Sequence, residues 1–143
     1  MMPSLPSPWV VRFAPLIRAG GAVLDLACGG GRHSRLLLER GHPVTAVDIE
    51  PSRAPAEAEV LAADLENGPW PLAGRRFAAV VMTNYLWRPL FGDLVAALDD
   101  DGVLIAETFA RGNEAFGRPR NPAHLLERGE LLRLCAEIGR AHV

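Results

Sequence analysis

Short apolar runs recur along the chain, and segments with the spacing of an amphipathic helix separate them. An apolar run without polar alternation is typical of a strand that is buried on both faces of a parallel sheet. Strands are predicted on this basis at residues 22–26, 43–50, 60–66, 76–84 and 102–109. Helices are predicted at residues 8–14, 31–41, 89–98 and 131–138. Strands that alternate with helices indicate an α/β domain, a three-layer sandwich with a mainly parallel sheet of about five strands.

Local signals support several of these boundaries. Ser7 and Pro8 are the preferred residue types for the N-cap and the first position of a helix. Pro51 and Pro55 disfavour a long helix between the second and third predicted strands. Residues 99–101, three consecutive aspartates, are expected to form a solvated turn and not a metal site, because metal ligands need a more varied spacing.

Composition narrows the class of protein. The chain has 143 residues, of which 49% are hydrophobic, so we expect a single domain over residues 1–143 with residues 1–6 as a loose arm. The formal net charge of −2 gives no indication of nucleic-acid binding. Two cysteines are too few for a disulfide framework, which favours a reduced, cytoplasmic setting. No apolar run reaches the roughly 18 residues of a membrane span, so we expect no membrane association.

The most informative stretch is residues 23–34, VLDLACGGGRHS, in which an apolar strand leads through an acid into three glycines and a helix. This order is typical of nucleotide-binding loops. A P-loop is excluded, because Arg32 and His33 stand where Gly-Lys would follow. A dinucleotide-binding loop, G-x-G-x-x-G/A, matches only in its first half, because Ser34 occupies the third position.

Acidic residues discriminate between the remaining ligands. A carboxylate at Asp25 would repel a pyrophosphate but attract the ammonium and sulfonium groups of S-adenosylmethionine. The glycines would let the amino-acid part of that ligand approach the backbone. Asp48 ends the second predicted strand, where a carboxylate can accept hydrogen bonds from both ribose hydroxyls. Asp64, expected at the end of the third strand, could meet the adenine edge.

These residues carry a family resemblance. The series Asp25-x-Ala-Cys-Gly29-x-Gly31, followed by VTAVD ending at Asp48 and by AADLE, resembles the Rossmann-like class I S-adenosylmethionine-dependent methyltransferases. The stretches RHS, TNYLWRPLF and LLERGELLRL look most like small bacterial members related to tellurite-resistance methyltransferases. The resemblance covers roughly residues 9–138 and implies S-adenosylmethionine as the cofactor.

The same resemblance implies a set of cofactor contacts. They are Asp25, Ala27, Gly29 and Gly31 at the methionine part, Asp48 at the ribose, Asp64 and Leu65 at the adenine, Asn84 near the transferred methyl group, and Ile49 as a further contact. No residue is identified as a general base, and the weak catalytic candidates are Asn84, Tyr85 and His124. His33, at the start of the second helix, is expected to be a capping or solvated residue, with an approach to the cofactor or acceptor as the alternative.

The sequence departs from the family pattern in three places. Ala27 stands where a glycine is commonest, which is tolerable if its backbone angles are ordinary. The segment after Asp48 is short. The family's sheet usually has two further strands after the last helix, and this chain stops at IGRAHV, where the sixth would begin, so we expect a truncated sheet. The fifth strand would then lie at an exposed edge, which favours a homodimer.

The expected function is transfer of a methyl group from S-adenosylmethionine to a small-molecule acceptor by in-line displacement, in which the protein mainly aligns the reactants. Two alternatives stay open. One is a module that binds the cofactor but lacks acceptor chemistry, which the missing strands favour. The other is a nicotinamide-dependent oxidoreductase of the same fold class, against which Asp25 and Ser34 argue.

Overall fold

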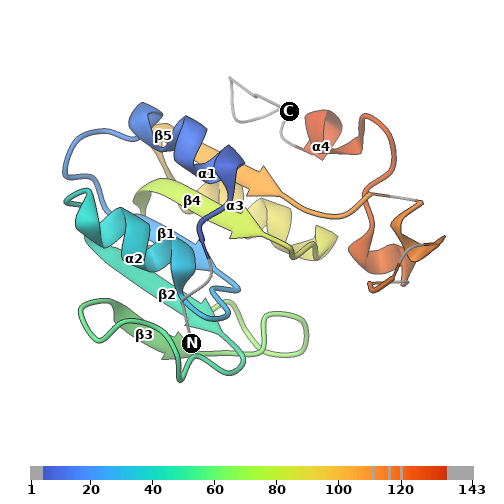
Figure 1. The fold of residues 1–143 in the computed structure, drawn as a ribbon, viewed down its shortest axis with the longest axis horizontal. Helices are drawn as coiled ribbons and strands as arrows, with labels where there is room; N and C mark the ends of the chain where they lie inside the picture. The colour runs from blue at the N-terminus through green and yellow to red at the C-terminus, as the bar shows by residue number, and fades with distance from the viewer. Residues whose placement is uncertain (1–4, 111, 116, 120, 135–143) are drawn as a thin grey trace.

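A five-stranded sheet in the order β3-β2-β1-β4-β5 forms the centre of the molecule (Figure 1). The structure is a computed structural model that describes residues 5–110, 112–115, 117–119 and 121–134. All neighbouring strands are parallel. The strands are β1 (Val23–Leu26), β2 (Val44–Asp48), β3 (Glu59–Ala62), β4 (Phe77–Thr83) and β5 (Leu98–Glu107). The predicted α/β fold with a parallel sheet is therefore confirmed.

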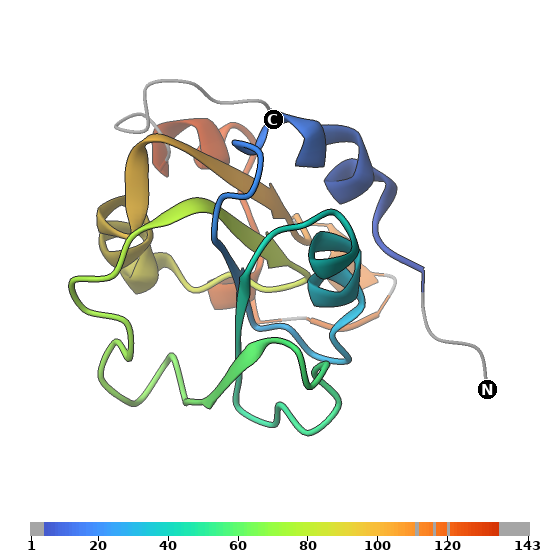
Figure 2. The ribbon, with the colours of Figure 1, turned by 90° about the vertical axis from the view of Figure 1, so that its left-hand side faces the viewer.

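Helices cover both faces of this sheet, as the three-layer prediction requires (Figure 2). One face packs on α1 (Pro8–Phe13) and α2 (Arg32–Glu39), whose Val10 and Leu37 share a buried cluster with Val23 of β1. The other face packs on α3 (Phe91–Ala96). The remaining described elements are η1 (Ala14–Leu16), η2 (Arg88–Leu90), η3 (Asn113–Ala115), η4 (Pro122–His124) and α4 (Glu130–Leu134).

The first helix begins as its residues predict. The Ser7 hydroxyl accepts a hydrogen bond from the Trp9 amide at 3.2 Å, and Pro8 occupies the first turn. Between β2 and β3, residues 49–58 form turns without a helix, in agreement with the expectation from Pro51 and Pro55. Of the predicted last helix, residues 135–138 lie outside the described residues.

Two strand boundaries were predicted wrongly. β3 ends at Ala62, so Asp64 does not end the strand. Residues 99–101 are not a turn but belong to β5, which pairs with β4 through a register shift near Phe77. Local composition misled this prediction, because the pairing with β4 passes from Phe77–Leu98 to Ala79–Val103, so the residues between them form a bulge within β5. β5 lies at one edge of the described sheet, and its pairing with a second copy stays a prediction.

A buried histidine joins four elements of the fold. The Ser7 amide donates to His33 Nε2 at 3.0 Å, so Nδ1 carries the proton and donates to Thr83 Oγ1 at 3.2 Å. Ser7 Oγ in turn donates to Glu107 Oε1 at 2.7 Å. The expectation that His33 is solvated is wrong, because its side chain is 2% exposed, and its hydrogen bond is with the N-cap residue of α1. Burial lowers the pKa of His33 to about 4.

Ala27 and Asn84, which follow β1 and β4, adopt left-handed backbone conformations with φ of 55° and 56°. The condition under which an alanine is tolerable at position 27, ordinary backbone angles, is therefore not met. The chain must turn sharply from the end of β1 into the glycines, and a left-handed residue makes that turn at a cost of roughly 1–2 kcal/mol for a residue with a Cβ. Among the described residues, no helix is long and apolar enough to cross a membrane.

Replacing Ala27 with glycine should stabilise the protein. Glycine removes the left-handed strain but adds chain entropy to the unfolded state, so we expect a gain of about 0.5–1 kcal/mol in the free energy of unfolding. The control is Ala96→Gly, at the exposed last residue of α3, where the same change relieves no left-handed strain and should not raise stability. Urea unfolding measures both, and a loss of stability in Ala27→Gly would contradict the prediction.

Replacing His33 with asparagine should cost more stability at neutral than at acid pH. Burial lowers the pKa of His33 from 6.5 to about 4 in the folded protein. The stability that neutral His33 contributes is therefore fully present above pH 6.5, and it is lost as the pH falls from 6.5 through about 4, because only the unfolded chain binds the proton there. The difference in unfolding free energy between wild type and His33→Asn should therefore shrink across this window. Equal differences at both ends of the window would show that the folded protein does not hold His33 neutral.

Candidate functional site

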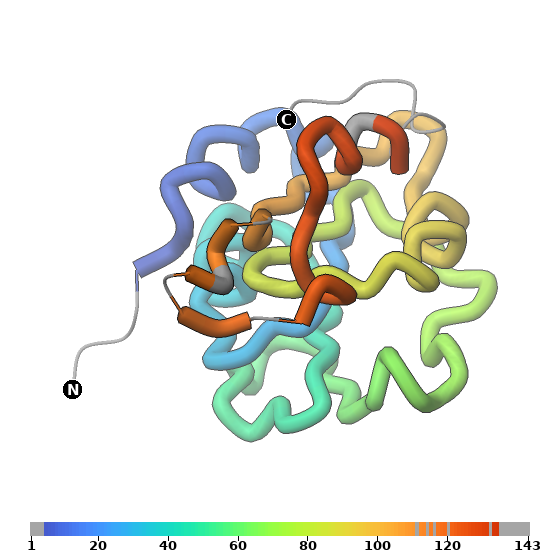
Figure 3. The backbone as a smooth tube through the Cα atoms, turned by 90° about the vertical axis from the view of Figure 1, so that its right-hand side faces the viewer, coloured from blue at the N-terminus to red at the C-terminus, as the bar shows by residue number. Residues whose placement is uncertain are grey.

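The carboxyl ends of the parallel strands all lie at one end of the sheet, and this end faces the viewer in Figure 3. Ligands of open parallel sheets bind at this end. The segments that follow β1 to β4 begin here, and described residues between 112 and 134, orange to red in Figure 3, lie across it. Most of the predicted site residues therefore lie on one side of the molecule.

The glycine loop joins β1 to α2 and leaves open space beside its backbone. Gly29 has a φ of +54°, and a Cβ built there would meet no atom within 4 Å. At Gly31, with a φ of +80°, a Cβ would lie 2.9 Å from Pro55 and 3.2 Å from Ala54. Gly31 is therefore needed for the close approach of the 49–58 segment, whereas the space beside Gly29 is available to a ligand.

Asp25 lies beneath this loop and not on its surface. Its side chain is 1% exposed, and its Oδ2 accepts a hydrogen bond of 2.6 Å from Ser34 Oγ. Burial raises the pKa of Asp25 to about 6. A direct contact between Asp25 and a cofactor stays a prediction, and the observed contact ties the end of β1 to the first turn of α2.

Asp48, at the end of β2, is half-buried next to the glycine loop. Its Oδ1 accepts a hydrogen bond of 3.4 Å from the Gly29 amide, and its Oδ2 accepts one of 3.0 Å from the Glu50 amide. The structure thus brings together the predicted ribose-binding acid and the open face of the loop. Ile49, which follows, is 70% exposed, an unusual state for an isoleucine.

Asp64 lies beyond β3, in a turn that its own side chain stabilises. Its Oδ1 accepts from the Glu66 amide at 3.0 Å and the Asn67 amide at 3.2 Å, and its Oδ2 accepts from Asn67 Nδ2 at 3.2 Å. The hydrogen bond from Asn67 is the main cause that lowers the pKa of Asp64. Leu65 packs against the core on the α3 side. The predicted adenine contacts of both residues stay predictions.

The structure brings two of the catalytic candidates together. The ring centroids of Tyr85 and His124 are 6.5 Å apart, and Trp87 lies 5.9 Å from His124. Tyr85 Oη donates to Glu66 Oε2 at 3.1 Å, and His124 Nε2 lies 3.9 Å from Glu66 Oε1. Asn84 is exposed, and its backbone amide donates to the backbone carbonyl of Glu107 at 2.7 Å. We call Glu66, Tyr85, Trp87 and His124 the aromatic cluster.

Burial and the neighbouring charge of Glu66 raise the pKa of Tyr85. Asp64 and Asp48 contribute to the same upward shift. Tyr85 is therefore a neutral hydrogen-bond donor at physiological pH and not a base. The carboxylates at the end of β2 and in the turn after β3 thus lie near the end of β4.

Sequence reasoning did not identify Glu66 as part of the site. It comes from the turn after β3, whereas its partners Tyr85 and His124 come from the ends of β4 and of the loop after β5. No periodicity or motif links these positions. The one signal is the grouping of Tyr85 and Trp87 directly after an apolar strand.

Comparisons with known proteins agree with this architecture. A methyltransferase-domain family model matches residues 23–102, which include β1 to β4 and the glycine loop. No curated protein matches the chain.

Solved structures share the fold at low sequence identity. A TehB-like SAM-dependent methyltransferase from Corynebacterium glutamicum has a TM-score of 0.64 and 22% identity, over 91% of this chain and 71% of that one. A SAM-dependent methyltransferase from Methanosarcina mazei has a TM-score of 0.68 and 17% identity, over 94% and 85%.

The extent of the match differs between relatives. A Pyrococcus horikoshii protein has a TM-score of 0.58 and 23% identity, and this chain spans only 59% of its length while 74% of this chain is matched. The family model, in contrast, spans more than half of the chain described here. The chain belongs to the methyltransferase-domain family.

Proposed function

We infer that the protein transfers a methyl group from S-adenosylmethionine to a small-molecule acceptor. The observation that carries this proposal is the open space beside Gly29, directly next to the half-buried carboxylate of Asp48. A carboxylate at that position suits the ribose hydroxyls of a nucleoside. Family membership and the similar SAM-dependent methyltransferases support the choice of cofactor.

The charges at the site favour a cationic ligand over a pyrophosphate. Asp48, Asp64 and Glu66 all lie close enough to Tyr85 to raise its pKa. The same negative potential would stabilise a sulfonium and an ammonium, and it would destabilise the phosphates of a nicotinamide dinucleotide. This argues against the oxidoreductase alternative.

In the proposed complex, this chain's residues bind and orient. The backbone at Ala27, Gly29 and Gly31 would hold the methionine part above the buried Asp25, and Asp48 with Ile49 would hold the ribose. Asp64 and Leu65 would meet the adenine. S-adenosylmethionine, when bound, supplies an electrophilic methyl group on a sulfonium. Asn84, Tyr85 and His124 would position the acceptor for in-line attack, a contribution that orientation alone can make large.

Asp48→Ala should weaken binding of S-adenosylhomocysteine tenfold or more, because hydrogen bonds to a charged group are worth about 1.5–3 kcal/mol each. Calorimetric titration measures the dissociation constant. The matched control is Asp101→Ala, at an exposed position of β5, which removes one carboxylate away from the site and should bind normally. Unchanged affinity in Asp48→Ala would remove Asp48 from the site. Tighter binding of NADH than of S-adenosylhomocysteine to the wild type would favour the oxidoreductase.

Gly29→Ala should reduce S-adenosylhomocysteine binding far more than Gly74→Ala does. Both glycines have positive φ, 54° and 77°, and a Cβ at either meets nothing within 4 Å, so both variants should lose about 1 kcal/mol of stability through backbone strain. Only the methyl group at Gly29 would occupy ligand space. Thermal melts and calorimetry separate the two effects, and equal affinities in both variants would mean that the loop only connects β1 to α2.

A further inference from the structure

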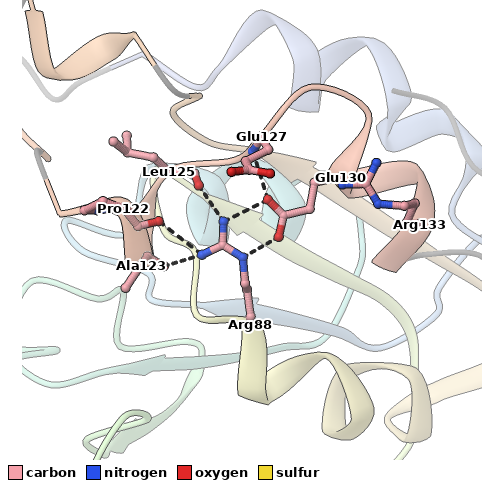
Figure 4. A pocket seen from close by; sticks show the side chains of 7 residues that line it. All are labelled: Arg88, Pro122, Ala123, Leu125, Glu127, Glu130 and Arg133. Atoms are coloured by element: carbon pink, nitrogen blue, oxygen red, sulfur yellow. Dashed lines mark hydrogen bonds and ion pairs between the residues drawn. The ribbon is translucent and has the colours of Figure 1, made fainter.

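Arg88, the first residue of η2, makes a dense set of hydrogen bonds to a segment far away in the sequence (Figure 4). Its Nη1 donates to the Pro122 and Ala123 carbonyls, both at 3.1 Å. Its Nη2 donates to the Leu125 carbonyl at 2.6 Å and to Glu130 Oε1 at 2.8 Å, and its Nε donates to Glu130 Oε2. The five N–H groups of the guanidinium are thereby all used.

Glu130 completes this arrangement from the start of α4. Besides the guanidinium, its Oε1 accepts a hydrogen bond of 2.8 Å from the Glu127 amide. The hydrogen bond from Arg88 is the main cause that lowers the pKa of Glu130 to about 2, so the carboxylate stays charged at physiological pH. Arg88 and Glu130 together hold the backbone from residue 122 to residue 130, which we call the 122–130 segment.

The open pocket of about 410 Å³ beside Arg88 is therefore not an anion site of that arginine. A bound phosphate or carboxylate would have to displace Glu130 or the backbone carbonyls, because no N–H of Arg88 remains free for it. Arg88 therefore holds the 122–130 segment in place.

His124 lies within the segment that Arg88 holds. Its Nδ1 donates to the Leu86 carbonyl at 2.9 Å, and its ring faces Trp87 and Tyr85. The flanking carbonyls, of Ala123 and Leu125, are both bound to Arg88. A guanidinium that fixes the residues on each side of His124 also fixes the direction in which its imidazole points.

We propose that Arg88 is the positioning residue that places His124 against Tyr85 and Trp87 and so completes the aromatic cluster. This proposal rests on the proposed function for its role in catalysis, because the cluster is the side from which the acceptor would meet the cofactor. The placement of His124 can be tested without that catalytic role. When the guanidinium of Arg88 is removed, the His124 imidazole should move away from Trp87. Lysine cannot replace Arg88, since its ammonium has three N–H donors, whereas the guanidinium has five in one plane.

Trp87 fluorescence tests the proposal without a known acceptor. Trp9→Phe/Trp70→Phe leaves Trp87 as the one tryptophan of the chain. The ring centroid of His124 lies 5.9 Å from that of Trp87, so removing the imidazole should change the emission of the indole. At one fixed pH, the difference in emission between the parent and His124→Asn is the signal that reports His124 beside Trp87.

In an Arg88→Gln background, His124→Asn should change the emission by less than half as much. The matched control is Arg75→Gln, which removes a comparable pair, Arg75 Nη2 to Glu59 Oε1 at 2.7 Å, away from the cluster, and in which His124→Asn should cause the full emission difference. A merely structural role would lower the melting temperature of Arg88→Gln but leave the emission difference unchanged. A full emission difference in folded Arg88→Gln overturns the proposal.

Arg88→Lys keeps the positive charge opposite Glu130 and covers the case in which Arg88→Gln does not fold. In this variant too, His124→Asn should change the emission by less than half as much, and a full emission difference overturns the proposal equally. Binding of S-adenosylhomocysteine to Arg88→Lys should stay within threefold of the parent, because Arg88 lies outside the predicted cofactor contacts. Absence of binding in the parent itself would refute the proposed function, while the emission difference still decides the role of Arg88.

Discussion

The hydrogen bond from Ser34 Oγ to Asp25 Oδ2 joins the end of the central strand to the first turn of α2 in a fully buried position. A carboxylate without a partner could not be buried there, and even with this partner burial raises its pKa. The bond leaves the chain between Leu26 and Arg32 only a short path, which it completes with left-handed backbone at Ala27, Gly29 and Gly31. This contact thus ties the two ends of the glycine loop, with the open space beside Gly29 between them.

The rest of the edge is arranged around that loop by parallel pairing. Cys28 donates its amide to the Val47 carbonyl at 2.9 Å, and the Gly29 amide reaches Asp48, so β2 delivers its carboxylate directly to the loop. On the other side, His33 connects the same helix to β4 through Thr83. The beginning of α2 is thus held by polar contacts from both neighbours of β1, and this explains how a glycine-rich turn can keep one shape.

Charge is distributed unevenly along this edge. The ends of β2 and β3 supply exposed or half-buried carboxylates, whereas the end of β4 supplies the aromatic rings of Tyr85 and Trp87. In the proposed function, a cationic cofactor would be attracted to the carboxylates, and the aromatic rings at the end of β4 would face the second reactant. The segment after β5 crosses between them, and its position depends on Arg88 and Glu130 rather than on sheet pairing.

The sequence by itself determined the parallel sheet, the turn at the glycines and the acid at Asp48, because these follow from local patterns: continuous apolar runs, a Gly-rich junction and a polar residue at a strand end. It did not determine the extent of β5, the end of β3 or the burial of His33. Those depend on partners distant in the sequence, such as β4, which pairs with Leu98 and Val103 on either side of residues 99–101, and Ser7 for His33. The aromatic cluster has the same origin, since Glu66, Tyr85 and His124 meet only after the sheet has brought the ends of its strands together. Local composition predicts backbone conformation one segment at a time, whereas contacts between side chains of different segments exist only in the packed chain.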